Sequence, residues 1–252
     1  MNNQTIEHQT IEHQTFEQQT FELQTIGFIR SPFKEKFGIP RQPGLIKSCK
    51  ARLELIPPYN NPDAVRGLNE FSHIWLTFQF HQNNNKAWRP LIRPPRLGGN
   101  KKVGVFASRS PFRPNNLGLS LVALHAVDVE NNATNLIIDC PDILDGTPIL
   151  DIKPYINYSD SVLNAQCSFA NTSPAATMQV KFNQGSQRTL ESIANEYEYC
   201  LKSLIVETLS YDPRPAYKAK DDSREYGVCL YDLNIIWRVE GDLIEVIEIQ
   251  KQ

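Results

Sequence analysis

Beyond the first 24 residues, apolar and polar side chains mostly alternate along the chain instead of following helical spacing. The clearest stretch is FSHIWLTFQFH at 71–81, where Ile74 and Leu76 share one face and His73 and His81 the other. A period of two places these sets on opposite sides of a strand, so we expect the first face in the core. The second face, which also carries a glutamine, is a candidate to line a pocket.

Other segments show the same short alternation and end at proline or glycine. Several short strands with Pro- and Gly-rich connections and few long helical patterns indicate a barrel or a sandwich. Further strands are expected at residues 24–33, 51–59, 102–108, 119–129 and 135–140, and a short helix or turn at 62–71.

The pattern changes near Tyr158, where residues 159–177 become small, polar and aperiodic, as in a linker. The remainder predicts a small α+β unit with a core of its own. Its expected elements are a strand at 178–182, one helix at 186–209, a Pro-rich loop at 211–227 and strands at 228–239 and 243–250. We therefore divide the chain into a repetitive, disordered extension (1–24), a β domain (25–160), a linker (161–174) and a C-terminal domain (175–252).

The extension repeats with a period of five (TIEHQ, TIEHQ, TFEQQ, TFELQ), which fits neither a helix nor a strand. His8 and His13 have no third ligand nearby, so no metal site is expected. There is no secretory signal and no apolar run long enough to span a bilayer. The five cysteines lack a C-x-x-C pair, which argues against a zinc site or a disulfide framework and favours a reducing, cytoplasmic compartment.

Charge is distributed unevenly. The formal net charge is −2, yet no Asp or Glu occurs between Phe71 and Val127. Such asymmetry indicates an anionic partner, although a solvated basic face with no ligand is the alternative. The basic residues of this stretch are Lys86, Arg89, Arg93, Arg96, Lys101, Lys102, Arg109 and Arg113.

Four segments are rich in polar side chains, and all but the second also contain prolines: GIPRQPGL (38–45), FHQNN (80–84), SRSPFRPNNLGLS (108–120) and PDILDGTPILDIKPY (141–155). Proline stiffens a loop and can hold its polar groups ready for a ligand. No Walker loop, G-x-G-x-x-G or G-x-S-x-G motif accompanies them, which disfavours a doubly wound nucleotide fold and covalent catalysis.

These segments together resemble the TrmO (TsaA-like) family. The stretches that carry the resemblance are IGFIRSPFKEKFGIPRQPGL, DAVRGLNEFSHIWLTFQFHQ, RPPRLGGNKKVGVFASRSPFRPNNLGLSLV and DGTPILDIKPY, with DPRPAY in the C-terminal part. The resemblance implies a dimeric β-barrel methyltransferase, unrelated to the Rossmann type. It implies S-adenosylmethionine as cofactor and N6 of threonylcarbamoyl-adenosine at position 37 of tRNA as the methylated atom.

The resemblance also implies which residues contact the cofactor. Carried onto this chain they are Pro40, Arg41, Gln42, His81, Gln82, Arg109, Leu119, Cys140, Pro141, Asp142 and Asp145. An arginine next to the sulfonium would be unfavourable, because both groups are positively charged. Arg109 or Arg41 is therefore expected at the cofactor's carboxylate or at a tRNA phosphate. Asp142 and Asp145 suit the cationic end or the ribose hydroxyls, and turn capping is the alternative for both.

The catalytic base stays open, because His81 is a candidate but a proton lost directly to water is equally consistent. For tRNA, Arg93, Arg96, Lys101, Lys102 and Arg113 are expected to follow the phosphates. Phe112 could stack on a base, or serve as an apolar plug beneath its loop. A non-catalytic RNA-binding barrel is the alternative function.

Overall fold

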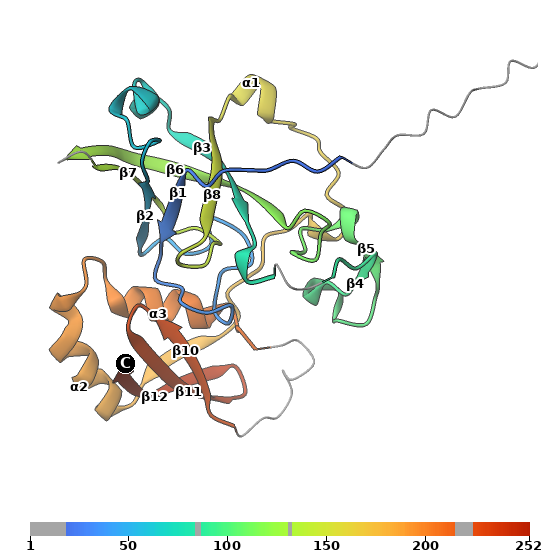
Figure 1. Ribbon diagram of the computed structural model, residues 1–252. Coiled ribbons are helices and arrows are strands. Elements are labelled where there is room, and N and C mark those ends of the chain that lie inside the picture. Colours follow the sequence, from blue (N-terminus) through green and yellow to red (C-terminus); the bar gives the residue numbers. More distant parts are fainter. Residues whose placement is uncertain (1–18, 84–86, 131–132, 215–223) are drawn as a thin grey trace, which may run out of the picture.

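The computed structural model describes residues 19–83, 87–130, 133–214 and 224–252. Most of the repetitive extension, including His8 and His13, lies outside this part of the chain, as does Lys86. The described residues form a β-barrel and a smaller α+β unit, which lie one above the other in Figure 1. The predicted fold class, a mainly β first domain and a small α+β second domain, is confirmed.

Six antiparallel strands close the barrel, in the order β1-β2-β7-β6-β3-β8. The alternation read from the sequence explains its interior, since Ile74 and Leu76 of β3 are fully buried together with Leu53, Leu136 and Ile149 from the other strands. The strands are β1 (Gly27–Arg30), β2 (Lys50–Leu55), β3 (His73–Gln79), β6 (Leu117–Glu130), β7 (Ala133–Asp139) and β8 (Pro148–Pro154).

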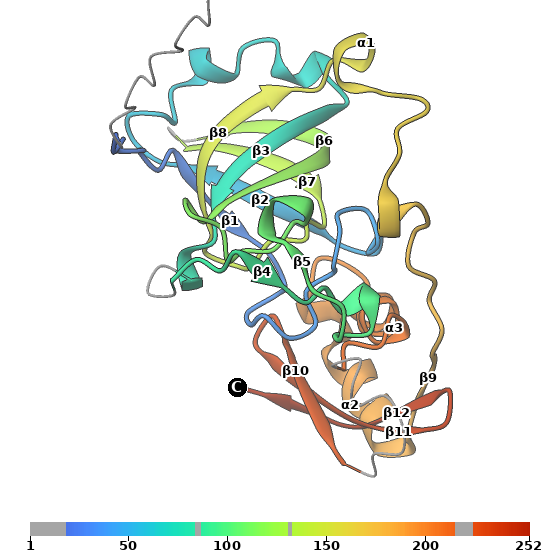
Figure 2. The same ribbon diagram turned by 90° about the vertical axis from the view of Figure 1, so that its right-hand side faces the viewer.

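A two-stranded lobe, β4 (Leu91–Ile92) with β5 (Val103–Gly104), projects beside the barrel and above the second sheet (Figure 2). Of the strand predicted at 102–108, only Val103 and Gly104 lie in a strand. The rest of that prediction was wrong, because residues 105–107 form a 3-10 helix. The short helices in and around the barrel are η1 (Pro62–Val65), η2 (Leu68–Glu70), η3 (His81–Asn83), η4 (Pro95–Leu97), η5 (Val105–Ala107) and α1 (Asn157–Asp160).

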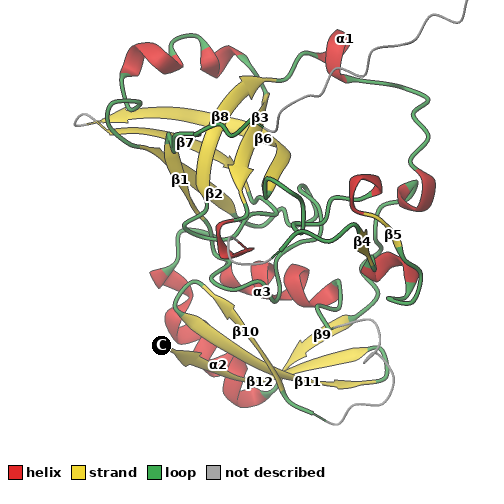
Figure 3. Cartoon of the chain, turned by 45° about the vertical axis from the view of Figure 1, so that its right-hand side comes forward, coloured by secondary structure: helices red, strands yellow, loops and turns green. Residues whose placement is uncertain are grey.

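The C-terminal sheet has the order β10-β11-β12-β9, with β9 parallel to β12 and the other pairs antiparallel. The linker before it contains the 3-10 helix η6 (Ser168–Ala170) and runs down the side of the molecule in Figure 3. The elements are β9 (Gln179–Phe182), α2 (Gln184–Ile193), η7 (Ala194–Glu196), α3 (Leu201–Ser210), β10 (Tyr226–Leu230), β11 (Leu233–Glu240) and β12 (Leu243–Lys251).

Two predictions for this unit were wrong. Residues 186–209 form two helices instead of the single expected helix. The chain between them is extended at Tyr197, and extended backbone lets two residues that are two positions apart face the same side. Tyr197 and Tyr199 both pack against the core in this way. The single strand expected at 228–239 is a hairpin that turns at Tyr231 and Asp232.

The C-terminal core is not its own, contrary to the prediction. Phe33, Ile46, Cys49 and Cys140 from the barrel's loops are buried in the same cluster as helix α3 and the second sheet. Polar contacts join the units as well, since the Glu207 carboxylate accepts hydrogen bonds from the backbone of residues 47 and 48. The two units therefore share one core across their junction.

A disulfide joins Cys49 to Cys140, whose Cα atoms are 5.5 Å apart. The expectation of no disulfide framework, drawn from five widely spaced cysteines without a C-x-x-C pair, is wrong for these two residues, which lie 91 positions apart. Lys50 of β2 pairs with Asp139 of β7 in an antiparallel register. This pairing places the next residues, Cys49 and Cys140, opposite one another. Cys167 and Cys200 are exposed free thiols, and Cys229 is a half-buried one.

Candidate functional site

One end of the barrel gathers the four polar segments, apart from the part of 141–155 that forms β8. In an antiparallel barrel, alternate connections emerge at the same end, and here these are the loops 31–49, 80–116 and 140–147. This end faces the C-terminal sheet in Figure 2, with the β4–β5 lobe at its side. Segments separated by a hundred residues in sequence are thereby brought to one place.

Two adjoining cavities lie among these loops. The inner cavity, of about 340 Å³, is lined by aromatic side chains and by His81, Gln82 and Asp142. The outer groove, of about 610 Å³, contains Arg41, Gln42 and Arg109. Pro111 and Phe112 line both spaces, so they form the boundary between them. The aromatic residues of the inner cavity are Phe78, Phe80 and Phe112.

Asp142 is the acidic residue of the inner cavity, which Lys36 also lines. Its carboxylate accepts a hydrogen bond from the Ser120 hydroxyl, and burial raises its pKa. The Ser120 hydrogen bond and the positive charge of Arg109 both lower the pKa of Asp142. The charge of Arg109, in the outer groove, therefore reaches a carboxylate in the inner cavity. Arg109 is itself held by Gln42, whose Oε1 accepts from Nη1 at 2.8 Å.

His81 begins helix η3 directly after the strand that builds the cavity wall. Burial, with a smaller contribution from the nearby Lys36 charge, lowers the pKa of its imidazole. The ring is therefore neutral near pH 7 and able to accept a proton. Lys36 is fixed by Asn83, whose Oδ1 lies 2.7 Å from Nζ.

The other expected cofactor residues lie outside both spaces. The Asp145 carboxylate turns to the opposite side of its loop, where it accepts from the Ser31 amide at 2.9 Å and pairs with Lys34 at 2.7 Å. Pro141 is buried, Cys140 is disulfide-bonded, Leu119 is exposed on β6, and Pro40 is half-buried in the 38–45 loop.

Among the residues expected to meet tRNA, Arg93, Arg96 and Lys102 line the outer groove, while Lys101 is exposed beside it. Arg96 also donates to the Thr172 carbonyl of the linker. Arg113 turns inward instead, because its Nη1 donates to the carbonyls of Ser108 at 2.7 Å and Val105 at 3.3 Å.

Sequence reasoning missed two exposed aromatic residues beside the lobe, Phe106 and Trp88. The Phe106 side chain is 72% exposed and lies against the Arg113 guanidinium, and Trp88 is 51% exposed. Phe112, which was considered for stacking, instead lies under Arg89 with 5.0 Å between guanidinium and ring centre. Both missed residues fall in the acid-free stretch, which is the signal that could have identified them.

Within the described ranges no three His, Cys, Asp or Glu side chains gather closely enough to hold a metal ion. No described helix has the length and apolar character needed to cross a bilayer.

Comparison with known proteins covers both units. Residues 28–161 match the tRNA-methyltransferase O N-terminal domain, and residues 175–252 match the TrmO C-terminal domain. The tRNA (adenine(37)-N6)-methyltransferase of Escherichia coli K12 is 48% identical over 226 residues, covering 89% of this chain and 96% of that protein. The enzyme of the same name from Eikenella corrodens is 41% identical over 170 residues, which are 68% of this chain and 92% of that one.

Solved structures show the same likeness. A crystal structure of TrmO from Pseudomonas aeruginosa superposes with a TM-score of 0.78 at 37% identity, covering 94% of this chain and all of the other. The barrel, the second sheet and the loops between them are thus matched by one relative along nearly the whole chain. The chain belongs to the TrmO family.

Proposed function

We propose that this chain transfers a methyl group from S-adenosylmethionine to N6 of the modified adenosine, threonylcarbamoyl-adenosine, at position 37 of tRNA. One observation supports it above the others. A chain of the TrmO family brings a half-buried carboxylate, a neutral histidine and an arginine to two adjoining cavities at the end of its barrel. The inner cavity is the proposed cofactor site, and the outer groove receives the RNA.

The lining of the two spaces fits the cofactor. Its adenine needs an apolar, aromatic wall, which Phe78, Phe80 and Phe112 provide. Its cationic end needs an anion shielded from water, which Asp142 provides. Its carboxylate needs a forked cation, which Arg109 offers from the outer groove, near enough for its charge to act on Asp142. The aspartate and the arginine therefore bind opposite charges of one zwitterionic ligand.

S-adenosylmethionine supplies an electrophilic methyl group on a sulfonium. Because transfer is an in-line displacement, the chain contributes alignment and exclusion of water. The aromatic wall keeps water from the reacting atoms, and Asp142 and Arg109 fix the orientation of the ligand. His81 is the proposed acceptor of the N6 proton, since its lowered pKa keeps Nδ1 or Nε2 free for a proton near pH 7.

The RNA is proposed to contact the lobe and the outer groove. Arg93, Arg96 and Lys102 can neutralise phosphates, and the exposed rings of Phe106 and Trp88 can stack on bases splayed from the anticodon loop. Arg113 contributes by holding the Phe106 segment in place.

Assembly, compartment and domain limits are proposed as well. We infer a homodimer, supported by the family resemblance, and a cytoplasmic enzyme, supported by its tRNA substrate. We propose domain limits of 25–160 and 175–252, joined by a linker at 161–174; the family matches at 28–161 and 175–252 support them.

The proposal is tested by nucleoside mass spectrometry of tRNA incubated with the protein and methyl-labelled S-adenosylmethionine. The tRNA comes in parallel from cells that make threonylcarbamoyl-adenosine and from cells that do not. Label on that nucleoside in the first pool alone is the expected result. No label in either pool, despite tRNA binding, would favour a non-catalytic RNA-binding barrel.

A further inference from the structure

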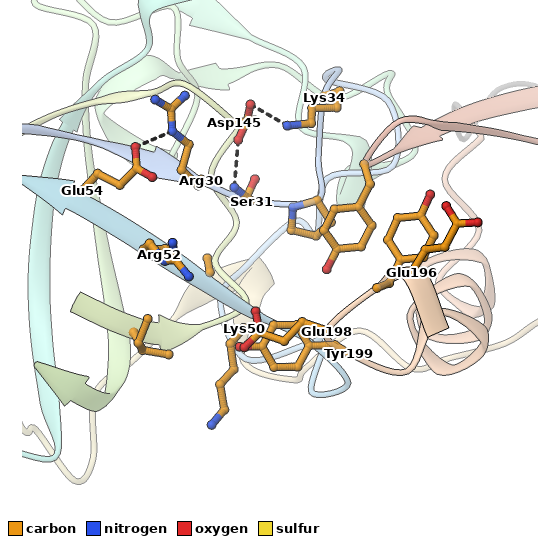
Figure 4. A pocket seen from close by; sticks show the side chains of 15 residues that line it. Arg30, Ser31, Lys34, Lys50, Arg52, Glu54, Asp145, Glu196, Glu198 and Tyr199 are labelled. Atoms are coloured by element: carbon orange, nitrogen blue, oxygen red, sulfur yellow. Dashed lines mark hydrogen bonds and ion pairs between the residues drawn. The ribbon is translucent and has the colours of Figure 1, made fainter. Parts of the chain in front are cut away.

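A third cavity, the interdomain pocket, lies on the other side of the 141–147 loop (Figure 4). Its volume is about 340 Å³, and both units contribute to its walls. Strands β1 and β2 supply one wall, and the segment between η7 and α3 supplies much of the other. Neither the methyl transfer nor the core packing accounts for this space.

The barrel wall carries more positive charge than its own acids neutralise. Arg30 pairs with Glu54 at 2.7 Å, and Lys34 pairs with Asp145 at 2.7 Å, as Figure 4 shows. Two further cations of β2, Lys50 and Arg52, form no ion pair with any described residue within 4 Å. Two positive charges of this wall are therefore without an ion-pair partner among the described residues, while Glu196 and Glu198 line the opposite wall.

The opposite wall is aromatic. Tyr197, Tyr199 and Tyr231 line it, and the rings of Tyr197 and Tyr231 lie 5.2 Å apart. The Tyr197 hydroxyl donates to Asp232 at 2.6 Å, which fixes that ring. Glu198 lies beside Tyr199 at the same wall. Tyrosine rings of this kind offer π-faces on which a base can stack.

Tyr231 occupies a backbone position that is costly for its residue type. It is the first residue of the two-residue β10–β11 turn and has a φ of +55°. Glycine, asparagine or aspartate is preferred there, because a bulky side chain is strained in the left-handed region. Strain of this sort persists where the surroundings hold it in place, and here the Tyr231 amide donates to the Pro32 carbonyl at 2.8 Å. The turn thus keeps an aromatic ring at the pocket.

We propose that the interdomain pocket binds one nucleotide. The base stacks on the tyrosine wall, the phosphate meets Arg52 and Lys50, and the ribose hydroxyls donate to Glu198. The nucleotide is either a residue of the bound tRNA away from its anticodon loop or a free nucleotide. The tRNA source rests on the proposed function, whereas the free-nucleotide source does not.

Occupation of this pocket would act on the cofactor site through one loop. Asp145 faces the interdomain pocket, while Asp142 and Ile143 face the inner cavity. Ser31 connects the two sides, since its amide donates to Asp145 and its hydroxyl donates to the Ile143 carbonyl at 3.0 Å. A nucleotide in the interdomain pocket would therefore lie against the loop that also carries Asp142.

The test titrates adenosine monophosphate into the full-length protein by calorimetry, with the inner cavity saturated by S-adenosylhomocysteine so that adenosine cannot bind there. Arg52→Ala and Tyr199→Ala should each weaken binding at least about fivefold, given the worth of a stacked base or a phosphate contact. Tyr199→Phe keeps the ring and should stay within about twofold of wild type. Arg188→Ala, which removes an exposed cation of α2, is the matched control and should bind normally.

A second arm identifies the source. If the nucleotide belongs to tRNA, saturating adenosine monophosphate and Arg52→Ala should each lower tRNA affinity; if it is free, tRNA affinity should not change. The proposal would be overturned if the wild type gave no heat with adenosine monophosphate. It would also be overturned if Arg52→Ala bound as tightly as the wild type, or if Tyr199→Ala bound as tightly as Tyr199→Phe. Failure of the wild type to methylate tRNA would overturn the proposed function and leave the calorimetric result standing.

Discussion

Gly118→Ala should damage the cofactor cavity from inside the barrel. Gly118 on β6 pairs with Phe78 on β3, and a Cβ on it would lie 2.8 Å from Cε1 of that ring and closer still to Cζ and Cε2. Ordinary carbon contacts lie near 3.5–4.0 Å, so the nearest ring atoms would have to move by roughly 1.5 Å. Phe78 is 4% exposed and packs edge-on against Phe80, so the inner cavity is the space that could take the movement.

Overpacking of this kind costs about 1–3 kcal/mol, which for a chain of this size corresponds to a fall in Tm of roughly 4–8 °C at 2 kcal/mol. Displacement into the cavity should also weaken S-adenosylmethionine binding about tenfold or more. Thermal unfolding and calorimetry measure the two effects. Gly104→Ala is the control, because a Cβ there meets nothing within 4 Å and φ is −60°. A Gly118→Ala protein with native Tm and native cofactor affinity would refute the reasoning.

Three further changes test other parts of the molecule. Burial raises the pKa of Asp142, so the folded protein holds that proton more tightly than the unfolded chain, and stability falls as the pH rises from the ordinary aspartate pKa through the raised one. Asp142→Asn should remove this fall in a series of Tm measurements between about pH 4 and 8, and should weaken cofactor binding. Phe106→Ala should lower tRNA affinity about fivefold in filter binding, with Phe106→Tyr near wild type and cofactor affinity unchanged in both. Phe33→Ala should destabilise the shared core by about 3–5 kcal/mol and shift a single calorimetric transition; two separate transitions would contradict that core.

The barrel was predictable because its strands bury one face and expose the other. In β3 the alternation of Ile74 and Leu76 with polar neighbours determines which side faces inward, and no distant contact is needed to read it. Strand β8 escaped notice because it begins and ends in proline and holds Asp151 and Lys153, whose polar side chains weaken the pattern.

The cavities depended on information that local pattern does not contain. Arg41, His81 and Asp142 were proposed from resemblance, and the structure explains their proximity through the barrel's common end. Side-chain direction was a different matter. Nothing local indicates that Asp145 turns to the opposite face of its loop or that Arg113 turns to two backbone carbonyls.

The shared core also has a consequence for the order of events during synthesis. All six barrel strands have been made once Pro154 is added, yet Phe33 and Ile46 must wait for α3 and the second sheet before they are covered. At about 5–20 residues per second, the ribosome needs roughly 5–20 seconds to bridge that interval. During this time the nascent barrel exposes the apolar side chains of Phe33 and Ile46 to chaperones and proteases. In a chain that terminates early they stay exposed.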